Sequence, residues 1–100
     1  MLDSVTVETF VELVGERFTV ESGDGSSQLF ELVEATSNPD HARTTGSTRD
    51  PFSLIFRGPI QPFLLQGTYR FQHREIGELD IFIVPIGPRD DHMQYQAVFS

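Results

Sequence analysis

The sequence predicts a mainly β protein: a small antiparallel β-barrel or roll of about six strands with one short N-terminal helix. Three observations support this fold class. From residue 17 onward, apolar side chains recur at every second position, which is the period of a half-buried strand. Short links containing Gly or Pro separate several of these segments, and short links favour antiparallel neighbours. Nine Phe and two Tyr supply a bulky core for 100 residues, which we expect to form a single domain, residues 1–100.

The N-terminal segment is expected to form the helix. Thr6 is a candidate N-cap, with Ser4 as the alternative, and Gly15 is a natural helix end. The apolar residues between them form a stripe at helical spacing: Phe10, Val11, Leu13 and Val14. Because so short a helix is unstable alone in water, we expect its stripe to pack on another part of the protein, with the sheet as the preferred surface.

A hairpin is predicted next, with strands at 17–21 and 29–36 and a turn at 22–28 that contains an Asp-Gly pair. The apolar residues of the second strand do not alternate cleanly, which predicts a bulge or a twist near Glu31. Alternation along this strand would place Glu31 and Glu34 on opposite faces, an arrangement unsuited to shared acid–base chemistry.

The second half of the chain predicts four strands, which we expect to form a meander. Their bounds are Phe52–Arg57, Thr68–His73, Glu78–Pro85 and Met93–Phe99. The segment at 78–85 carries Phe82 and Val84 on the face opposite its main apolar face. It is therefore expected to be a central strand that is buried on both sides. Closure of the sheet would cover its edges, including that of the last strand.

The segment from Ser37 to Asp50 is polar, long and rich in turn residues. We expect a surface loop there, with a binding loop as the alternative.

The connection Gly58–Gly67 is unusually apolar for a link between strands. Pro59 and Pro62 cannot donate ladder hydrogen bonds, so the segment is not expected to lie inside a sheet. It nevertheless contains four large apolar residues: Ile60, Phe63, Leu64 and Leu65. These side chains either plug an open end of the barrel or form an exposed patch that docks a partner. On the second interpretation they are candidate partner-binding residues.

Composition excludes several classes of function. The net charge is -8, and all seven basic residues are Arg, so no basic face is available for nucleic acid or for an anionic membrane surface. The absence of Cys removes disulfides and thiolate chemistry. There is no apolar run of the roughly 20 residues that span a bilayer, and the N-terminus does not resemble a secretory signal. We therefore expect a cytoplasmic location.

No catalytic, cofactor-binding or metal-binding residue is predicted. The three histidines, His41, His73 and His92, form no metal-binding motif. The run Asp90–His92 offers two carboxylates and an imidazole, but a polar hairpin turn explains the same residues and is the preferred interpretation. The protein is therefore expected not to be an enzyme and to need no cofactor.

Several stretches resemble a family of short bacterial proteins known only as a domain of unknown function. The resemblance rests on five stretches of sequence: the pattern from Phe10 to Phe18, the pattern at Leu32–Thr36, "PFSLIFRGP", the pattern from Gln66 to Pro88 that begins "QGTYRFQH", and the C-terminal "MQYQAVF". It covers nearly the whole chain apart from the segments 22–28 and 37–50. The resemblance implies no catalytic residues, and it favours an accessory role in a phage-tail-like assembly.

The predicted function is therefore that of a non-enzymatic protein-interaction or assembly module, whose partner is another protein or a second copy of the chain. The alternative is a small β-domain that binds a small ligand or a carbohydrate through the 37–50 segment and its aromatic side chains.

Overall fold

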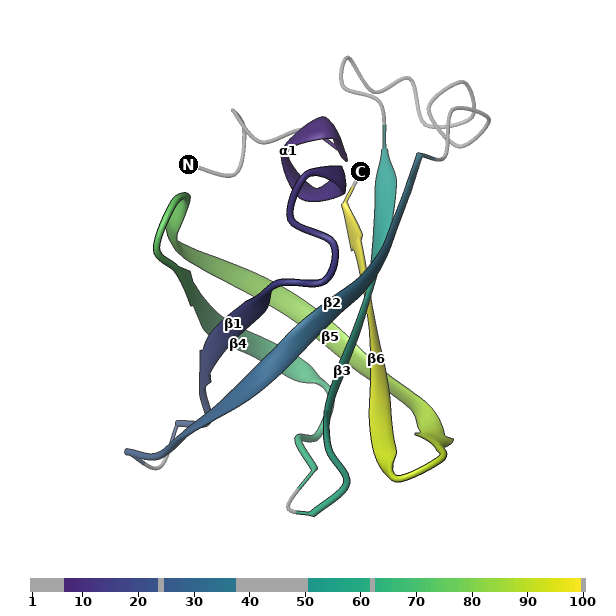
Figure 1. Cartoon of the computed structure of the whole chain (residues 1–100). Helices are drawn as coiled ribbons and strands as arrows, with labels where there is room; N and C mark the ends of the chain where they lie inside the picture. The colour runs from purple at the N-terminus through teal and green to yellow at the C-terminus, as the bar shows by residue number, and fades with distance from the viewer. Residues whose placement is uncertain (1–6, 24, 38–50, 62, 100) are drawn as a thin grey trace.

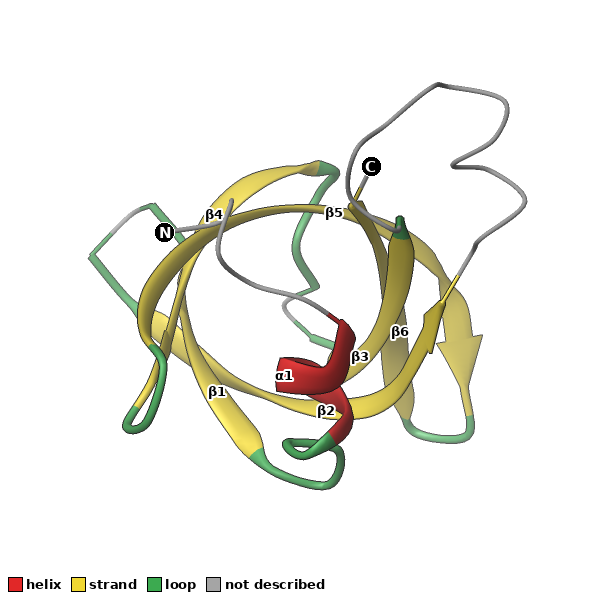
Figure 2. Cartoon of the chain, turned by 90° about the horizontal axis from the view of Figure 1, so that it is seen from above, coloured by secondary structure: helices red, strands yellow, loops and turns green. Residues whose placement is uncertain are grey.

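The computed structural model of the protein describes residues 7–23, 25–37, 51–61 and 63–99. It contains one helix and six strands: α1 (Val7–Val11), β1 (Arg17–Glu21), β2 (Ser27–Ser37), β3 (Phe52–Pro59), β4 (Gly67–His73), β5 (Gly77–Arg89) and β6 (His92–Phe99). The strands form a closed antiparallel barrel, as Figures 1 and 2 show. The predicted fold class is confirmed. No helix among the described residues has the length and apolar character that crossing a membrane requires.

The strand order around the barrel is β1-β2-β3-β6-β5-β4, and pairing of β1 with β4 closes it. The prediction of a four-strand meander is wrong, because β3 and β4 are not neighbours. Strand β6 lies between β3 and β5 instead. The two short links form hairpins, β4–β5 and β5–β6, whereas the connection from β3 to β4 crosses one end of the barrel (Figure 1).

Strand β2 contains the expected bulge, slightly later than predicted. The register with β3 shifts between Leu32 and Glu34. Glu31 lies opposite Arg57, and Glu34 lies opposite Ile55, two residues along the same face of β3. Both glutamates are therefore on the outer surface, and the prediction of opposite faces is wrong. The extra residue in the bulge reverses the alternation of side chains beyond it.

Strand β5 is longer than predicted and is buried on one face only. The strand continues to Arg89. From Val84 onward its only described neighbour is β6, so its other edge is not paired with a described strand. Pro85 and Pro88 are tolerated there because proline can lie in a strand that has an open edge. The turn is thereby reduced to two residues that begin with Asp90 at φ 57°. Phe82 is half exposed, so the expectation of a central strand buried on both faces is wrong. In a closed barrel every strand has an inner and an outer face.

Helix α1 covers one opening of the barrel, as the view along its axis in Figure 2 shows. The ring of Phe10 packs against Phe52 and Phe99, at centroid distances of 5.7 and 5.9 Å. Leu13 is buried as well, whereas Val11 and Val14 are exposed. Only half of the predicted apolar stripe therefore packs on the sheet. The proposed caps, Thr6 and Ser4, lie outside the described residues.

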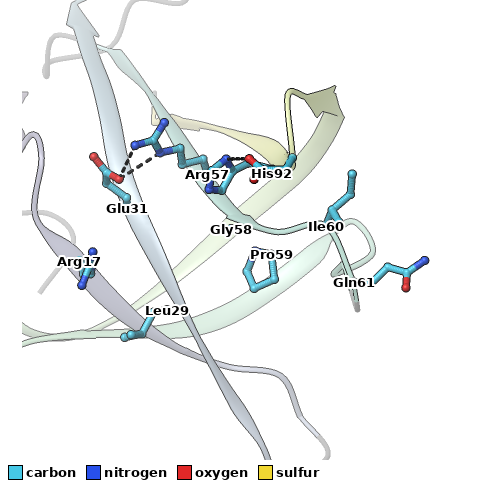
Figure 3. A pocket seen from close by; sticks show the side chains of 10 residues that line it. Arg17, Leu29, Glu31, Arg57, Gly58, Pro59, Ile60, Gln61 and His92 are labelled. Carbon is cyan, nitrogen blue, oxygen red and sulfur yellow. Dashed lines mark hydrogen bonds and ion pairs between the residues drawn. The ribbon is translucent and has the colours of Figure 1, made fainter.

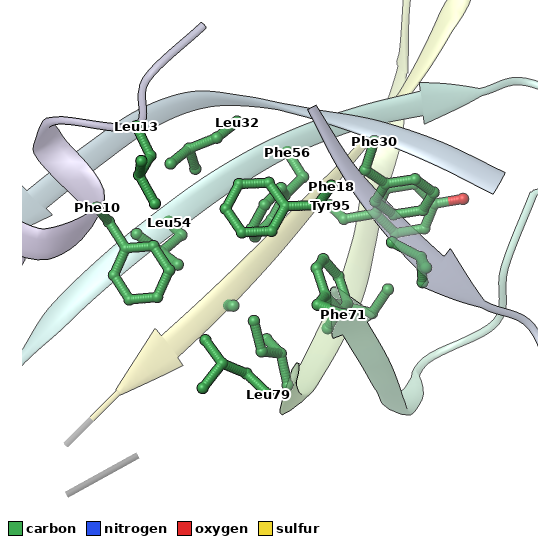
Figure 4. Close-up of a cluster of buried hydrophobic side chains, with 14 of the residues drawn as sticks. Phe10, Leu13, Phe18, Phe30, Leu32, Leu54, Phe56, Phe71, Leu79 and Tyr95 are labelled. Atoms are coloured by element: carbon green, nitrogen blue, oxygen red, sulfur yellow. The ribbon is translucent and has the colours of Figure 1, made fainter. Parts of the chain in front are cut away.

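Aromatic side chains fill the barrel interior (Figure 4). Phe30 stacks on Tyr95 with their centroids 4.7 Å apart, and Phe18 packs edge-on against Phe56 at 5.5 Å. The inner face of β6 contributes Met93, Tyr95, Ala97 and Phe99, as the sequence predicted. Because side chains fill the interior, we expect a binding site on the outer surface or at one of the two ends of the barrel.

Candidate functional site

The β3–β4 connection spans residues 60–66, and its described residues, 60–61 and 63–66, lie at the end of the barrel opposite α1 (Figure 1). Two tyrosine hydroxyls hold it there. The backbone N–H of Leu64 donates a hydrogen bond of 2.8 Å to the hydroxyl of Tyr95, which is buried in the core. The hydroxyl of Tyr69 donates one of 2.8 Å to the carbonyl of Leu65. The connection is therefore fixed to the barrel at two consecutive residues.

The four predicted partner-binding residues divide between the two interpretations. Leu64 is buried and closes this end of the core, as a plug would. The other three are exposed: Ile60 by 39%, Phe63 by 46% and Leu65 by 70%. We call these three side chains the connection patch. That the patch contacts a partner stays a prediction. The segment is also closer to the sheet than expected, because Pro59 is the last residue of β3 and pairs with His92.

A groove of about 460 Å³ lies beside the connection patch and shares Ile60 with it. Figure 3 shows the side chains that line it. They include Arg17 and Leu29 on one side, Pro59 and Ile60 at the end of β3, and His92 beyond. Across its upper part, the Nε and a terminal nitrogen of Arg57 donate hydrogen bonds of 3.0 and 2.8 Å to one carboxylate oxygen of Glu31. The groove therefore combines apolar walls with charged groups.

Gly58, which lines this groove, packs directly on the core. A Cβ at this position would lie 2.5 Å from the Phe30 ring, which is far inside van der Waals contact. Phe30 is itself fixed by its stacking on Tyr95. Glycine at residue 58 therefore lets β3 pass close over the aromatic core, and it places the groove directly above that core.

A second cluster of polar groups lies where β1 begins and β4 ends. Nε2 of His73 is 2.7 Å from a carboxylate oxygen of Glu16, and Nδ1 accepts a hydrogen bond of 3.1 Å from the backbone N–H of Glu75. Because that N–H can only donate, the ring proton is on Nε2 and is donated to Glu16. The His73 ring also packs against Phe18 at 4.9 Å. Each ring nitrogen of His73 therefore takes part in a hydrogen bond.

One ligand atom from each of Glu16, His73 and Glu75 lies within 4.8 Å of the others, as in a metal site. The hydrogen bonds oppose that interpretation. A metal on Nε2 would move the ring proton to Nδ1. Two donors, Nδ1–H and the N–H of Glu75, would then face each other, and the hydrogen bond between them would be lost. A metal on Nδ1 would break the bond that this nitrogen already accepts. We therefore interpret the cluster as a structural link between the segment before β1 and the end of β4.

The other sequence candidates show no convergent chemistry. Asp90 and Asp91 form the β5–β6 turn, and a carboxylate oxygen of Asp91 lies 2.9 Å from Nδ1 of its neighbour His92. Within the described part of the chain, the only group of three metal-ligating side chains that come together is the His73 cluster. His41 and most of the 37–50 segment lie outside the described residues.

A family model described as Domain of unknown function (DUF6916) matches residues 5–99. The chain belongs to this family. The match covers α1 and all six strands, so the groove and the connection patch both lie within the DUF6916 domain. Comparisons with curated proteins and with solved structures gave no match.

Sequence reasoning missed Arg17 and Leu29 as groove residues. Leu29 lies among the residues of β2 that break the alternating pattern, and its side chain is 57% exposed. The sequence signal that could have identified Leu29 was therefore an apolar residue at a position expected on the outer face of a strand. Its proximity to Ile60 depends on the way β3 crosses the end of the barrel, which periodicity does not reveal.

Proposed function

We propose that this DUF6916 domain is a non-enzymatic protein-interaction or assembly module that contacts its partner through the connection patch. One observation carries the proposal. A connection fixed to the barrel by Tyr69 and Tyr95 presents three large apolar side chains to solvent within six residues. Single exposed apolar residues are common on proteins, whereas a cluster of them is typical of an interaction surface.

The fixed backbone supports this function through its effect on binding entropy. A mobile loop would lose conformational freedom on association, and that loss opposes binding. Here the buried side chain of Leu64 and the two tyrosine hydrogen bonds already hold residues 64 and 65 of the connection in place. Phe63 is an aromatic residue of the kind that is enriched at the centres of interfaces. The partner is another protein or a second copy of this chain, and the sequence resemblance favours a phage-tail-like assembly.

The alternative function, binding of a small ligand or a carbohydrate through aromatic side chains, is less well supported. Most of the aromatic rings pack inside the barrel, and the hydroxyl of Tyr69 is engaged by Leu65. Among the described aromatic side chains only Phe63 and Phe82 are largely exposed.

Site-specific photocrosslinking in the producing cell tests the proposal. A photoreactive phenylalanine analogue at residue 65 is expected to give a discrete crosslinked product, identified by mass spectrometry, and Phe63→Asp is expected to abolish it. The matched control places the analogue at Val14, an exposed apolar residue at the other end of the barrel. Thermal unfolding checks that Phe63→Asp remains folded. Identical products from residues 65 and 14, or a product that persists in Phe63→Asp, would contradict the proposal.

A further inference from the structure

Among the residues that the structure describes, no strand pairs with the first residues of β2 along the edge that faces β3. It pairs with β1 from Ser27 to Glu31 and with β3 from Glu31 to Ser37. Beyond Glu31, toward the connection patch, the described part of β3 turns away from β2. Figure 1 shows the two strands separating toward this end of the barrel. An unpaired strand edge exposes backbone donors and acceptors that can pair with another chain.

The hydrogen bonds of Leu32 show which backbone groups point into this gap. Its N–H donates to the carbonyl of Glu16 at 3.0 Å, and its own carbonyl accepts from Gly15 at 2.8 Å, both on the β1 side. Backbone groups alternate in direction along a strand, so those of Phe30 also face β1. The N–H and the carbonyl of Leu29 therefore face the opposite side, into the gap.

The residue that would pair with Leu29 is a proline. Glu31 lies opposite Arg57, so a continued register would bring Leu29 opposite Pro59. Proline has no N–H to donate, and Pro59 pairs with His92 of β6 on its other side. The ladder between β2 and β3 thus ends at Glu31 and Arg57, because Pro59 could not donate the next hydrogen bond. The groove opens at that point.

The groove supplies side chains for recognition as well as this backbone edge. Leu29 and Ile60 form its exposed apolar walls. Arg17 lies opposite Glu31 on β1, but Glu31 is already bound to Arg57. No carboxylate among the described residues forms an ion pair with Arg17. The groove therefore complements an apolar side chain that is accompanied by a carboxylate.

We propose that the groove binds an extended segment of a partner protein as an added strand on β2. The segment pairs with the N–H and carbonyl of Leu29, inserts an apolar side chain between Leu29 and Ile60, and places a carboxylate on Arg17. This mode of binding, in which a peptide joins a sheet edge, is known for other folds. The inference rests on the proposed interaction function and specifies how the partner is held. A second copy is disfavoured as the occupant, because each copy carries a net charge of -8.

Selection of short linear peptides displayed on phage against the full-length protein supplies the probe. The best peptide is then synthesised with a single N-methyl group at each backbone position in turn, and its affinity is measured by calorimetry. Strand addition predicts an alternating pattern, because every second amide faces β2. Methylation at those positions is expected to weaken binding by about tenfold or more, and at the intervening positions much less. The protein is unchanged in this series, so folding does not affect the comparison.

Charge reversal tests the role of Arg17. Arg17→Glu is expected to lower the affinity for the acidic peptide by about tenfold. A peptide with Lys in place of its carboxylate is expected to bind this variant with the affinity restored. An absence of enriched peptides, or a methylation series without alternation, would overturn the added strand. Binding that is lost in Phe63→Asp but unchanged in Arg17→Glu would also overturn it, while leaving the connection patch as the interaction surface.

Discussion

Replacing Gly58 with alanine tests the close packing between β3 and the aromatic core. The new Cβ would lie 2.5 Å from Cε1 and 2.7 Å from Cδ1 of the Phe30 ring. The ring cannot easily retreat, because it stacks on Tyr95 at 4.7 Å and meets Phe71 edge-on at 5.8 Å. Overpacking of a core costs about 1–3 kcal/mol. The loss of backbone freedom in the unfolded chain offsets about 0.4–1 kcal/mol of this.

With values near the centre of both ranges, the expected net loss of unfolding free energy is about 1–2 kcal/mol. In a domain of this size that loss lowers the Tm by roughly 4–16 °C, measured by urea and thermal unfolding. Gly67→Ala is the matched control, because its Cβ would meet nothing closer than 3.6 Å, at the ring of Tyr69. The control is expected to be neutral or slightly stabilising. Equal stability of the two variants would refute the close approach of β3 to Phe30.

The remaining predictions concern the hydrogen bonds at the two ends of the barrel. Tyr95→Phe leaves the N–H of Leu64 without its acceptor and is expected to cost about 1–3 kcal/mol in urea unfolding; an unchanged midpoint would contradict the bond. Burial raises the pKa of Tyr95 above its ordinary 10.0, an effect that the hydrogen bond from Leu64 partly opposes. The unfolded chain therefore loses this proton first, so stability should fall as the pH rises above about 10. The fall should be smaller in Tyr95→Phe, and an identical pH profile would argue against the raised pKa. His73→Ala is expected to cost about 2–3 kcal/mol. Glu16→Gln should change stability by less than about 0.5 kcal/mol, because a neutral amide oxygen also accepts from Nε2–H. A loss in Glu16→Gln as large as that in His73→Ala would contradict this account of the hydrogen bond.

Much of the barrel follows from local sequence patterns. The alternation of apolar residues located all six strands, and the inner face of β6 was predicted residue by residue because that strand is regular. The bulge in β2 left a visible irregularity, but its effect on the direction of Glu34 depends on which residue is inserted. Phe82 was misplaced because an apolar residue on the outer face of a barrel strand looks the same in sequence as one in a buried strand.

The strand order could not be predicted from the same patterns. Short links identify hairpin neighbours, whereas the pairing of β3 with β6 joins segments far apart in the sequence and depends on closure of the whole sheet. The groove could not be predicted for the same reason, because it also depends on how distant segments meet. The apolar connection was recognised from its composition, but the groove exists only because β3 leaves β2 after Arg57 and Pro59 cannot continue the ladder.

Amide hydrogen exchange along β2, resolved by NMR in the isolated protein, tests most directly whether the ladder between β2 and β3 ends at Glu31. The account predicts that the N–H of Leu29 exchanges much faster than that of its neighbour Phe30, which faces β1. Protection of Leu29 equal to that of Phe30 would show that this edge is already paired, and it would remove the site proposed for a partner strand.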